Sequence, residues 1–193
     1  TAVFQKLGIS YEIIMVDDGS SDHTLQLIEK ICSEDSRIKY ISFSRNFGHQ
    51  LAMFAGVEKC SGNHIVLIDG DLQDPPEMIE ALWNKKNEGY DTVYAKRNIR
   101  KGESWLKKAT AALFYRILNK ITSINIPVDT GDFRIISRKV ADELIRMKDH
   151  SKFLRGQIAW LGFRQTFVEF ERDSRTTGKT GYPLGKMINF ALD

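Results

Sequence analysis

Short apolar runs alternate with longer amphipathic stretches along the first half of the chain. The runs predicted to be strands are residues 12–16, 38–43, 64–68 and 91–95. Stretches whose apolar residues recur at helical spacing lie between them, at 25–32, 50–59 and 76–83. Strands that alternate with helices in this way predict an α/β fold, with a mainly parallel sheet and helices on both of its faces.

The second half of the chain has a different pattern. Residues 105–121 form a basic amphipathic stretch, which fits either a surface helix packed on the sheet or a helix lying on an anionic membrane surface. The basic residues at 96–101, just before this stretch, favour the second interpretation, a helix on the membrane surface. The further elements predicted are a strand at 133–137, helices at 140–147 and 153–160, a strand at 163–170, a basic loop at 172–181 and a helix from 184.

Composition and charge narrow the class of protein. The 193 residues fit a single domain, 1–193, and the 42% of hydrophobic and 27% of charged residues are typical of a folded chain rather than a disordered one. A net charge of +3 is too balanced to require nucleic acid as a partner. No apolar run approaches the roughly 20 residues of a membrane-spanning helix, and no signal peptide is recognisable. We therefore expect a chain that neither spans a membrane nor is secreted.

Two acidic clusters follow predicted strands. Asp17 and Asp18 end the first strand, and Asp69 and Asp71 follow the third. Because ligands of such sheets bind beyond the carboxyl ends of the strands, we expect both clusters at one polar site. Residues two apart in an extended segment point the same way, so Asp69 and Asp71 can hold a divalent ion between them, with Gln73 as a further oxygen ligand. The sequence therefore predicts a site for Mg²⁺ or Mn²⁺.

Several motifs, in this order along the chain, carry a resemblance to a known family. They are VDDGSSDHT at 16–24, SRNFGH at 44–49, DGDLQDPP at 69–76, GDFR at 131–134, and GYPL with KM at 181–187. Together they resemble the family 2 inverting glycosyltransferases of the GT-A fold. The most similar branch is the polyprenyl-phosphate glycosyltransferases, which include dolichol-phosphate mannose synthase and the bactoprenol glucosyl transferases. The resemblance covers nearly the whole chain.

The resemblance implies a role for individual residues. Asp18 would hold the base or ribose of the nucleotide, Asp17 would support its loop, and Asp132 would be the catalytic carboxylate beside the acceptor. The nucleotide-sugar site would consist of Asp17, Asp18, Asp69 and Gly70, and the metal site of Asp69, Asp71 and Gln73. The residues that would face phosphates are Arg97, Arg134, Arg172, Arg175 and Lys179, because arginine binds phosphate with two parallel hydrogen bonds.

The same resemblance implies the reaction and its partners. A sugar would pass from a nucleotide-diphosphate sugar, with a UDP-sugar favoured, to a polyprenyl phosphate with inversion, and Mg²⁺ or Mn²⁺ would be the cofactor. The acceptor phosphate has a second pKa of about 6 and is mostly dianionic at neutral pH, so Asp132 could position the acceptor or a cation instead of taking a proton. Asp132 could also be a turn residue that caps a backbone N–H. The enzyme would act on the cytoplasmic side of the cell membrane, where the full-length protein would be anchored; self-association is left open.

Two differences from the branch affect these expectations. Members begin with a strand and a loop that packs on the base, whereas this chain starts beyond that point, so we expect the sheet to lack its first strand. Members also carry Ser-Lys before the Tyr-Pro-Leu motif, whereas Thr180 and Gly181 stand here. Lys179 is expected to replace the missing lysine.

Other functions remain open at this stage. They are a family 2 glycosyltransferase with a saccharide acceptor, a phosphoacceptor receiver-type signalling domain, a metal phosphatase, and a folded but inactive relic. The receiver alternative leaves the basic helix and the loop at 172–181 without a role. Four scattered histidines are given no role: His23, His49, His64 and His150.

Overall fold

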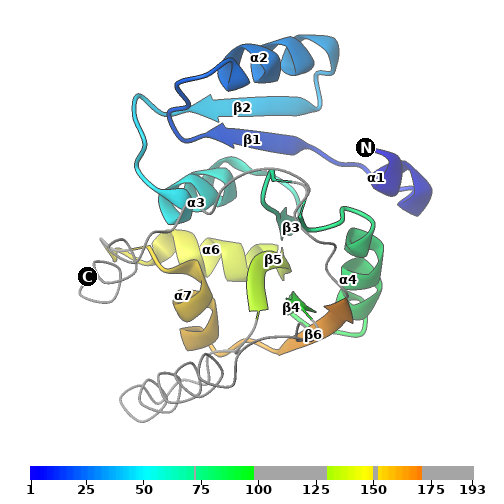
Figure 1. Cartoon of the computed structure of the whole chain (residues 1–193). Helices are drawn as coiled ribbons and strands as arrows, with labels where there is room; N and C mark the ends of the chain where they lie inside the picture. The colour runs from blue at the N-terminus through cyan, green and yellow to red at the C-terminus, as the bar shows by residue number, and fades with distance from the viewer. Residues whose placement is uncertain (72, 98–129, 150–151, 171–193) are drawn as a thin grey trace, which may run out of the picture.

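The strands that the structure describes form two separate sheets (Figure 1). The computed structural model describes residues 1–71, 73–97, 130–149 and 152–170. In the smaller sheet, β1 (Ile13–Asp17) pairs in parallel with β2 (Ile38–Ser42). The larger sheet has the order β3-β5-β4-β6 and consists of β3 (His64–Leu67), β4 (Thr92–Arg97), β5 (Thr130–Ser137) and β6 (Gln165–Phe170).

The strand β5 runs against its neighbours in the larger sheet. It pairs antiparallel with both β3 and β4, whereas β4 pairs in parallel with β6. Three of the four strands therefore share one direction, and the expectation of a mainly parallel sheet does not hold for β5. An apolar run predicts a strand but not its direction, which is set by the connections. As a result, the start of β5 lies beside the end of β3, with Leu67 opposite Arg134.

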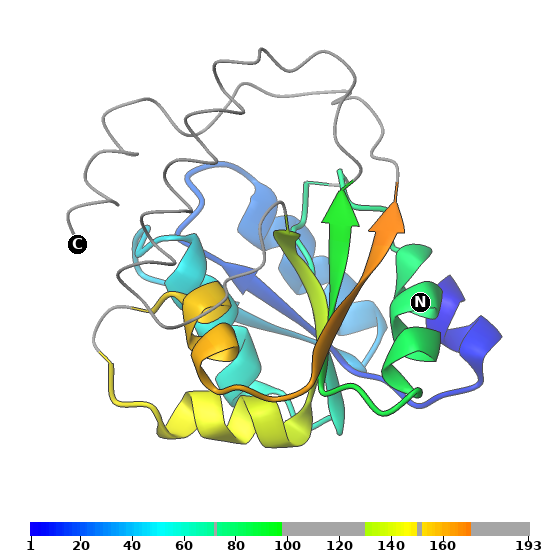
Figure 2. The same cartoon turned by 90° about the horizontal axis from the view of Figure 1, so that it is seen from below.

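Helices cover both faces of the larger sheet, as predicted (Figure 2). They are α1 (Ala2–Leu7), α2 (Thr24–Glu34), α3 (His49–Lys59), α4 (Met78–Lys86), α6 (Arg138–Arg146) and α7 (Leu154–Trp160). The helices α3, α6 and α7 lie on one face, α4 and α1 lie on the other, and α2 packs on the smaller sheet. None of the described helices is both long and apolar enough to cross a bilayer.

Alternation along β5 builds a hydrophobic core on each face of the larger sheet. Ile136 packs with residues of α3, α6 and α7. Phe133 and Ile135 pack instead with α4 and with Phe170 of β6. Successive side chains of a strand point to opposite faces, so Arg134 lies on the face of α3, α6 and α7. Two cores of this kind hold β5 from both sides.

The smaller sheet is joined to the rest through α3. That helix packs on β1 and contacts α6. Within the described residues β1 pairs with β2 alone and β3 with β5 alone, so each has one unpaired edge. The predicted basic helix at 105–121, the loop at 172–181 and the helix from 184 lie outside the described residues.

Gly19 brings the two loops of the smaller sheet into contact, and this generates a prediction. Its φ is 69°, and a Cβ atom there would collide with the backbone of Arg45. We expect Gly19→Ala to lower the free energy of unfolding by at least about 2 kcal/mol in urea denaturation, because a side chain is strained in this conformation. Gly70→Ala is the control, since a Cβ at Gly70 meets no atom within 4 Å. Equal stability of the two variants would contradict the close approach of Gly19 to the backbone of Arg45.

Candidate active site

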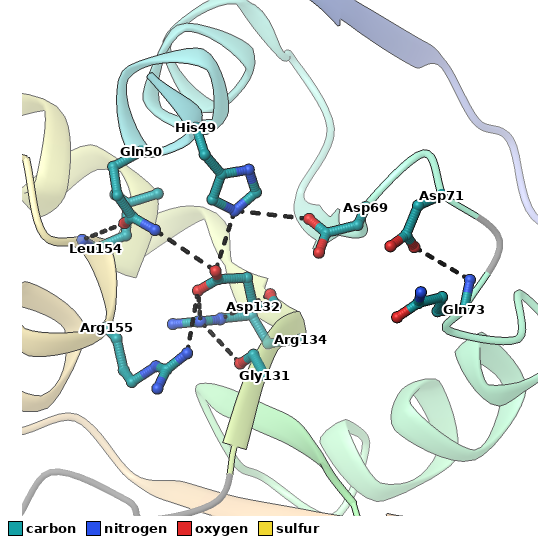
Figure 3. Close-up of polar contacts among 10 residues, drawn as sticks. All are labelled: His49, Gln50, Asp69, Asp71, Gln73, Gly131, Asp132, Arg134, Leu154 and Arg155. Atoms are coloured by element: carbon teal, nitrogen blue, oxygen red, sulfur yellow. Dashed lines mark hydrogen bonds and ion pairs between the residues drawn. The ribbon is translucent and has the colours of Figure 1, made fainter. Parts of the chain in front are cut away.

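Asp132, at the start of β5, lies at the centre of a polar cluster (Figure 3). Its Oδ2 is 3.0 Å from Nε2 of His49 and 3.5 Å from Nε2 of Gln50. Its Oδ1 accepts a hydrogen bond from Nη2 of Arg134 at 2.7 Å, and Nη2 of Arg155 lies 3.6 Å away. One carboxylate thus brings three elements together: α3, β5 and α7.

The positions of these partners follow from the elements that carry them. His49 and Gln50 are the first two residues of α3, and Arg155 is the second residue of α7. Oε1 of Gln50 accepts a hydrogen bond from the N–H of Leu154, which joins the starts of the two helices. Arg134 is two residues beyond Asp132 on β5, so both side chains point to the same face of the sheet.

The cations hold Asp132 in its ionised form. Burial alone would raise the pKa of Asp132, but the hydrogen bond from His49 and the charges of Arg134 and Arg155 outweigh burial and lower that pKa to about 2. The hydrogen bond to Asp132 in turn raises the pKa of His49, and Asp69 adds to this effect. Because an ionised carboxylate can only accept, the ring of His49 donates from Nε2.

Arg134 is held beside Asp132 by several hydrogen bonds. Its side chain is fully buried, and it donates hydrogen bonds to the carbonyl oxygens of Gly131 and Asp132 as well as to the Asp132 carboxylate. The guanidinium also lies 5.1 Å from the ring centre of Tyr94. In this structure Arg134 therefore supports Asp132, and the predicted contact with phosphate stays a prediction.

The predicted metal ligands lie on the loop that follows β3, next to Asp132 (Figure 3). Oδ1 of Asp69 is buried, accepts no hydrogen bond from the residues that the structure describes, and is 3.6 Å from Nε2 of His49. Burial raises the pKa of Asp69, while His49 opposes this rise. Oδ1 of Asp71 accepts a hydrogen bond from the N–H of Gln73 at 3.1 Å.

The donor atoms of this loop fit a hard divalent ion. Asp69, Asp71 and Gln73 offer oxygen atoms, and within the described part of the chain the buried Asp69 oxygen has no hydrogen-bond donor. Among the residues described, no three His, Cys, Asp or Glu side chains are grouped so that they could hold an ion. Two carboxylates and one amide oxygen on one loop suit Mg²⁺ or Mn²⁺, since such ions take one or two carboxylates and complete their shell with water and substrate phosphates.

The first acidic cluster fixes the chain ahead of α3. The two carboxylate oxygens of Asp18 accept the N–H groups of Phe47 and Gly48, at 2.7 and 2.9 Å. Asp17 is buried, and it accepts hydrogen bonds from the N–H of Ser20 and the hydroxyl of Ser42. Asp18 therefore positions the residues that immediately precede His49. The predicted contacts of Asp17, Asp18 and Gly70 with a nucleotide sugar stay predictions.

The structure describes no side chain of the other predicted phosphate ligands. Arg97 is the last residue of β4, so its backbone lies at the carboxyl end of that strand. Arg172, Arg175 and Lys179 lie outside the described residues. Their roles stay predictions.

Three residues of the cluster were not found by sequence reasoning. His49 is the last residue of the SRNFGH motif at 44–49 and Gln50 follows it, so their place in the chain was a usable signal. His49 was given no role from the sequence, since its partners Asp69 and Asp132 are distant along the chain and are brought close to it by the fold. Arg155 lies in a helix without any motif and had no such signal.

The buried ion pair of Arg134 and Asp132 generates a prediction for stability. We expect Arg134→Met to lower the free energy of unfolding by about 3–5 kcal/mol at pH 7, because it leaves a buried carboxylate with weaker partners. The pKa of Asp132 in the folded protein, about 2, lies below its ordinary value, so its ionised form stabilises the fold above pH 4 and this contribution is lost as the pH falls through 2. In Arg134→Met, Asp132 takes up its proton at a higher pH than in the wild type. The loss in free energy of unfolding relative to the wild type should therefore become smaller between pH 5 and about 3.

Urea denaturation of both proteins across this pH range is the measurement. Arg146→Met is the matched control, because Arg146 is largely exposed and its pairing with Glu143 contributes little. A deficit for Arg134→Met no larger than that of the control would contradict the assigned ion pair.

Comparison with known proteins identifies the family. The family model described as glycosyl transferase family 2 matches residues 2–145. An uncharacterized glycosyltransferase, YkcC of Bacillus subtilis (strain 168), is 52% identical over 184 residues, which cover 95% of this chain and 57% of that protein. The bactoprenol glucosyl transferase of Shigella phage SfV is 38% identical over 182 residues, covering 94% of this chain and 59% of that protein. The chain thus spans less than two thirds of the length of these relatives.

Solved structures agree in fold. Mannosyltransferase PcManGT from Pyrobaculum calidifontis, in complex with GDP-Man and Mn²⁺, has a TM-score of 0.57 at 17% identity, covering 89% of this chain and 49% of that one. TarS 1–349 of S. aureus in complex with UDP has a TM-score of 0.52 at 15% identity, covering 83% and 51%. These likenesses support the predicted α/β fold of the GT-A type. The family model and the sequence relatives together show that the chain belongs to glycosyl transferase family 2.

Proposed function

We propose that the chain carries the catalytic site of an inverting glycosyltransferase. It would move a sugar from a nucleotide-diphosphate sugar, with UDP favoured as the nucleotide, to a polyprenyl phosphate in the presence of Mg²⁺ or Mn²⁺. The family assignment leaves the receiver-type and phosphatase alternatives without support. The proposed acceptor has support in the names of relatives, which include bactoprenol glucosyl transferases from Shigella phage SfV and a prophage homologue from Escherichia coli.

One observation carries the proposal: two carboxylates from different elements meet at His49. Asp69 comes from the loop after β3 and Asp132 from β5, and both approach Nε2 of the same ring. This meeting depends on the antiparallel course of β5, which brings its start to the end of β3. A donor bound at the Asp69 loop would therefore have its sugar near Asp132, where we propose that the acceptor binds.

Asp69, Asp71 and Gln73 would hold the metal ion. When bound, the ion would offset the negative charge of the nucleotide diphosphate that leaves. The protein's part is to supply oxygen ligands from one short loop, with Asp69 held in place beside His49. GDP-Man and Mn²⁺ in PcManGT and UDP in TarS are ligands of proteins with a similar fold.

Asp132 would position a cation, Arg155, for the acceptor and would not remove a proton from it. A carboxylate with a pKa of about 2 is a weak base at neutral pH. A phosphate monoester is already mostly dianionic there and can attack the sugar directly. Attack from the side opposite the leaving nucleotide inverts the anomeric carbon. Arg155, which lies 3.6 Å from Asp132 and keeps 22% of its side chain exposed, would balance the charge of an incoming phosphate.

The proposed acceptor also places the reaction at a membrane. A polyprenyl phosphate is held in the bilayer by its hydrocarbon chain, so transfer would take place on the cytoplasmic face of the cell membrane. The domain would approach that surface with its acceptor site.

The metal site is tested with Asp71→Asn. We expect this change to lower metal-dependent transfer of labelled sugar from UDP-sugars to polyprenyl phosphate by about 100-fold, equal to about 2.7 kcal/mol of activation free energy, because a ligand of the ion loses its charge. Asp142→Asn is the control, since Asp142 lies on α6 and is half exposed. EDTA should abolish transfer by the wild type.

Two results would count against the proposal. Undiminished transfer by Asp71→Asn, or by the wild type in EDTA, would contradict the metal site. Transfer to free saccharides but not to polyprenyl phosphate would replace the proposed acceptor with a saccharide.

A further inference from the structure

His49 has contacts that none of the predicted roles requires. Its Nε2 is 3.0 Å from Oδ2 of Asp132 and 3.6 Å from Oδ1 of Asp69. We infer that His49 is a positioning residue, whose ring sets the place of the Asp132 carboxylate relative to the Asp69 loop. The inference rests on the proposed function, because it concerns how the acceptor side of that site is aligned with the donor side.

The backbone of His49 is held from the side of the smaller sheet. His49 begins α3, and the two residues before it, Phe47 and Gly48, donate their N–H groups to Asp18. Asp18 itself follows β1, so these bonds tie the start of α3 to the end of that strand. The ring thus projects from a fixed point toward the larger sheet (Figure 3).

The carboxylates that meet at His49 need such a group. Asp69 and Asp132 lie on different elements, and two carboxylates at one site repel each other unless a cation or a donor stands between them. The side chain of Asp132 is further fixed by Gln50, whose amide also binds the start of α7. His49 is the member of this cluster that touches both carboxylates, so it couples the loop after β3 to β5.

Packing does not account for the position of the ring. The side chain of His49 is 37% exposed, whereas the core on the same face consists of residues such as Val57 and Ile136 with no exposure. Substitution of His49 therefore removes polar contacts with little loss of buried apolar surface. This difference allows a role in alignment to be separated from a role in folding.

Three substitutions of His49 test the inference in the intact protein. His49→Ala removes the ring, His49→Leu keeps its bulk without a donor, and His49→Gln keeps an N–H donor at a similar reach. We expect Ala and Leu to lower kcat at least tenfold and up to about 100-fold, with the KM for the nucleotide sugar and for the polyprenyl phosphate changed less than threefold, because small misplacements of reacting groups are costly. Gln should stay within about threefold of the wild-type kcat.

The control is His64→Gln, at the opposite end of β3. His64 accepts a hydrogen bond from Lys86 and contacts Trp83, and glutamine can accept in its place. This variant should keep the wild-type kcat. Thermal melts of all variants establish that each is folded at the temperature of the assay.

Several results would overturn the inference. One is wild-type kcat in His49→Ala. Another is equal impairment of the Gln and Leu variants, which would show that the donor is not what matters. A third is a higher KM for the polyprenyl phosphate at unchanged kcat, which would make His49 a direct ligand of the acceptor.

A second measurement keeps the inference separate from the proposed function. If the wild type transfers no sugar to polyprenyl phosphate, the proposed function fails, but the contact of His49 with Asp132 can still be tested without substrate. Thermal melts of His49→Leu, Asp132→Asn and the double variant form a cycle. We expect the double variant to lose less in melting temperature than the sum of the single losses, because both remove the same interaction. Additive losses would overturn the inference.

Discussion

The pairing of one largely buried carboxylate with several cations is the constraint on which this site depends. Asp132 is removed from much of the water that would stabilise its charge, so its ionised form requires the hydrogen bonds from His49 and Arg134 and the nearby charge of Arg155. These partners come from α3, β5 and α7, and Gln50 links the two helices directly. The need to satisfy one charge therefore sets how three elements meet. A site built in this way is ordered before any substrate arrives.

The direction of β5 decides which groups can share the site. In a fully parallel sheet, the start of β5 would lie at the edge opposite the end of β3. Because β5 runs antiparallel, Leu67 and Arg134 are partners, and the loop that carries Asp69 and Asp71 lies beside Asp132, two residues before Arg134. The loops after β1 and β2 reach the same region from the side of the smaller sheet, since Asp18 holds the backbone ahead of α3. Both acidic clusters thus serve the same region, although only the second approaches Asp132 directly.

Sequence reasoning could find the elements and the acidic loops, because each is encoded locally. The run at 38–43 became β2 at Ile38–Ser42, and the run at 64–68 became β3 at His64–Leu67. The direction of β5 is not encoded in its apolar pattern. The burial of Arg134 could not be predicted either, since an arginine beside an aspartate suits both a phosphate site and an internal ion pair. The partners of His49 are brought close only by the fold, so no local motif could reveal them.

The central claim, that Asp132 is held as a carboxylate by its cationic neighbours, can be measured directly. The carboxyl carbon of Asp132, labelled with ¹³C and assigned by comparison with Asp132→Asn, would be followed by NMR as the pH is lowered. The account predicts no titration of this signal between pH 7 and about 3, because the pKa of Asp132 is about 2. A titration midpoint at or above the ordinary aspartate value of about 4 would contradict it. Asp132 would then be a carboxyl group of ordinary basicity, and the arrangement of cations described around it would not exist in solution.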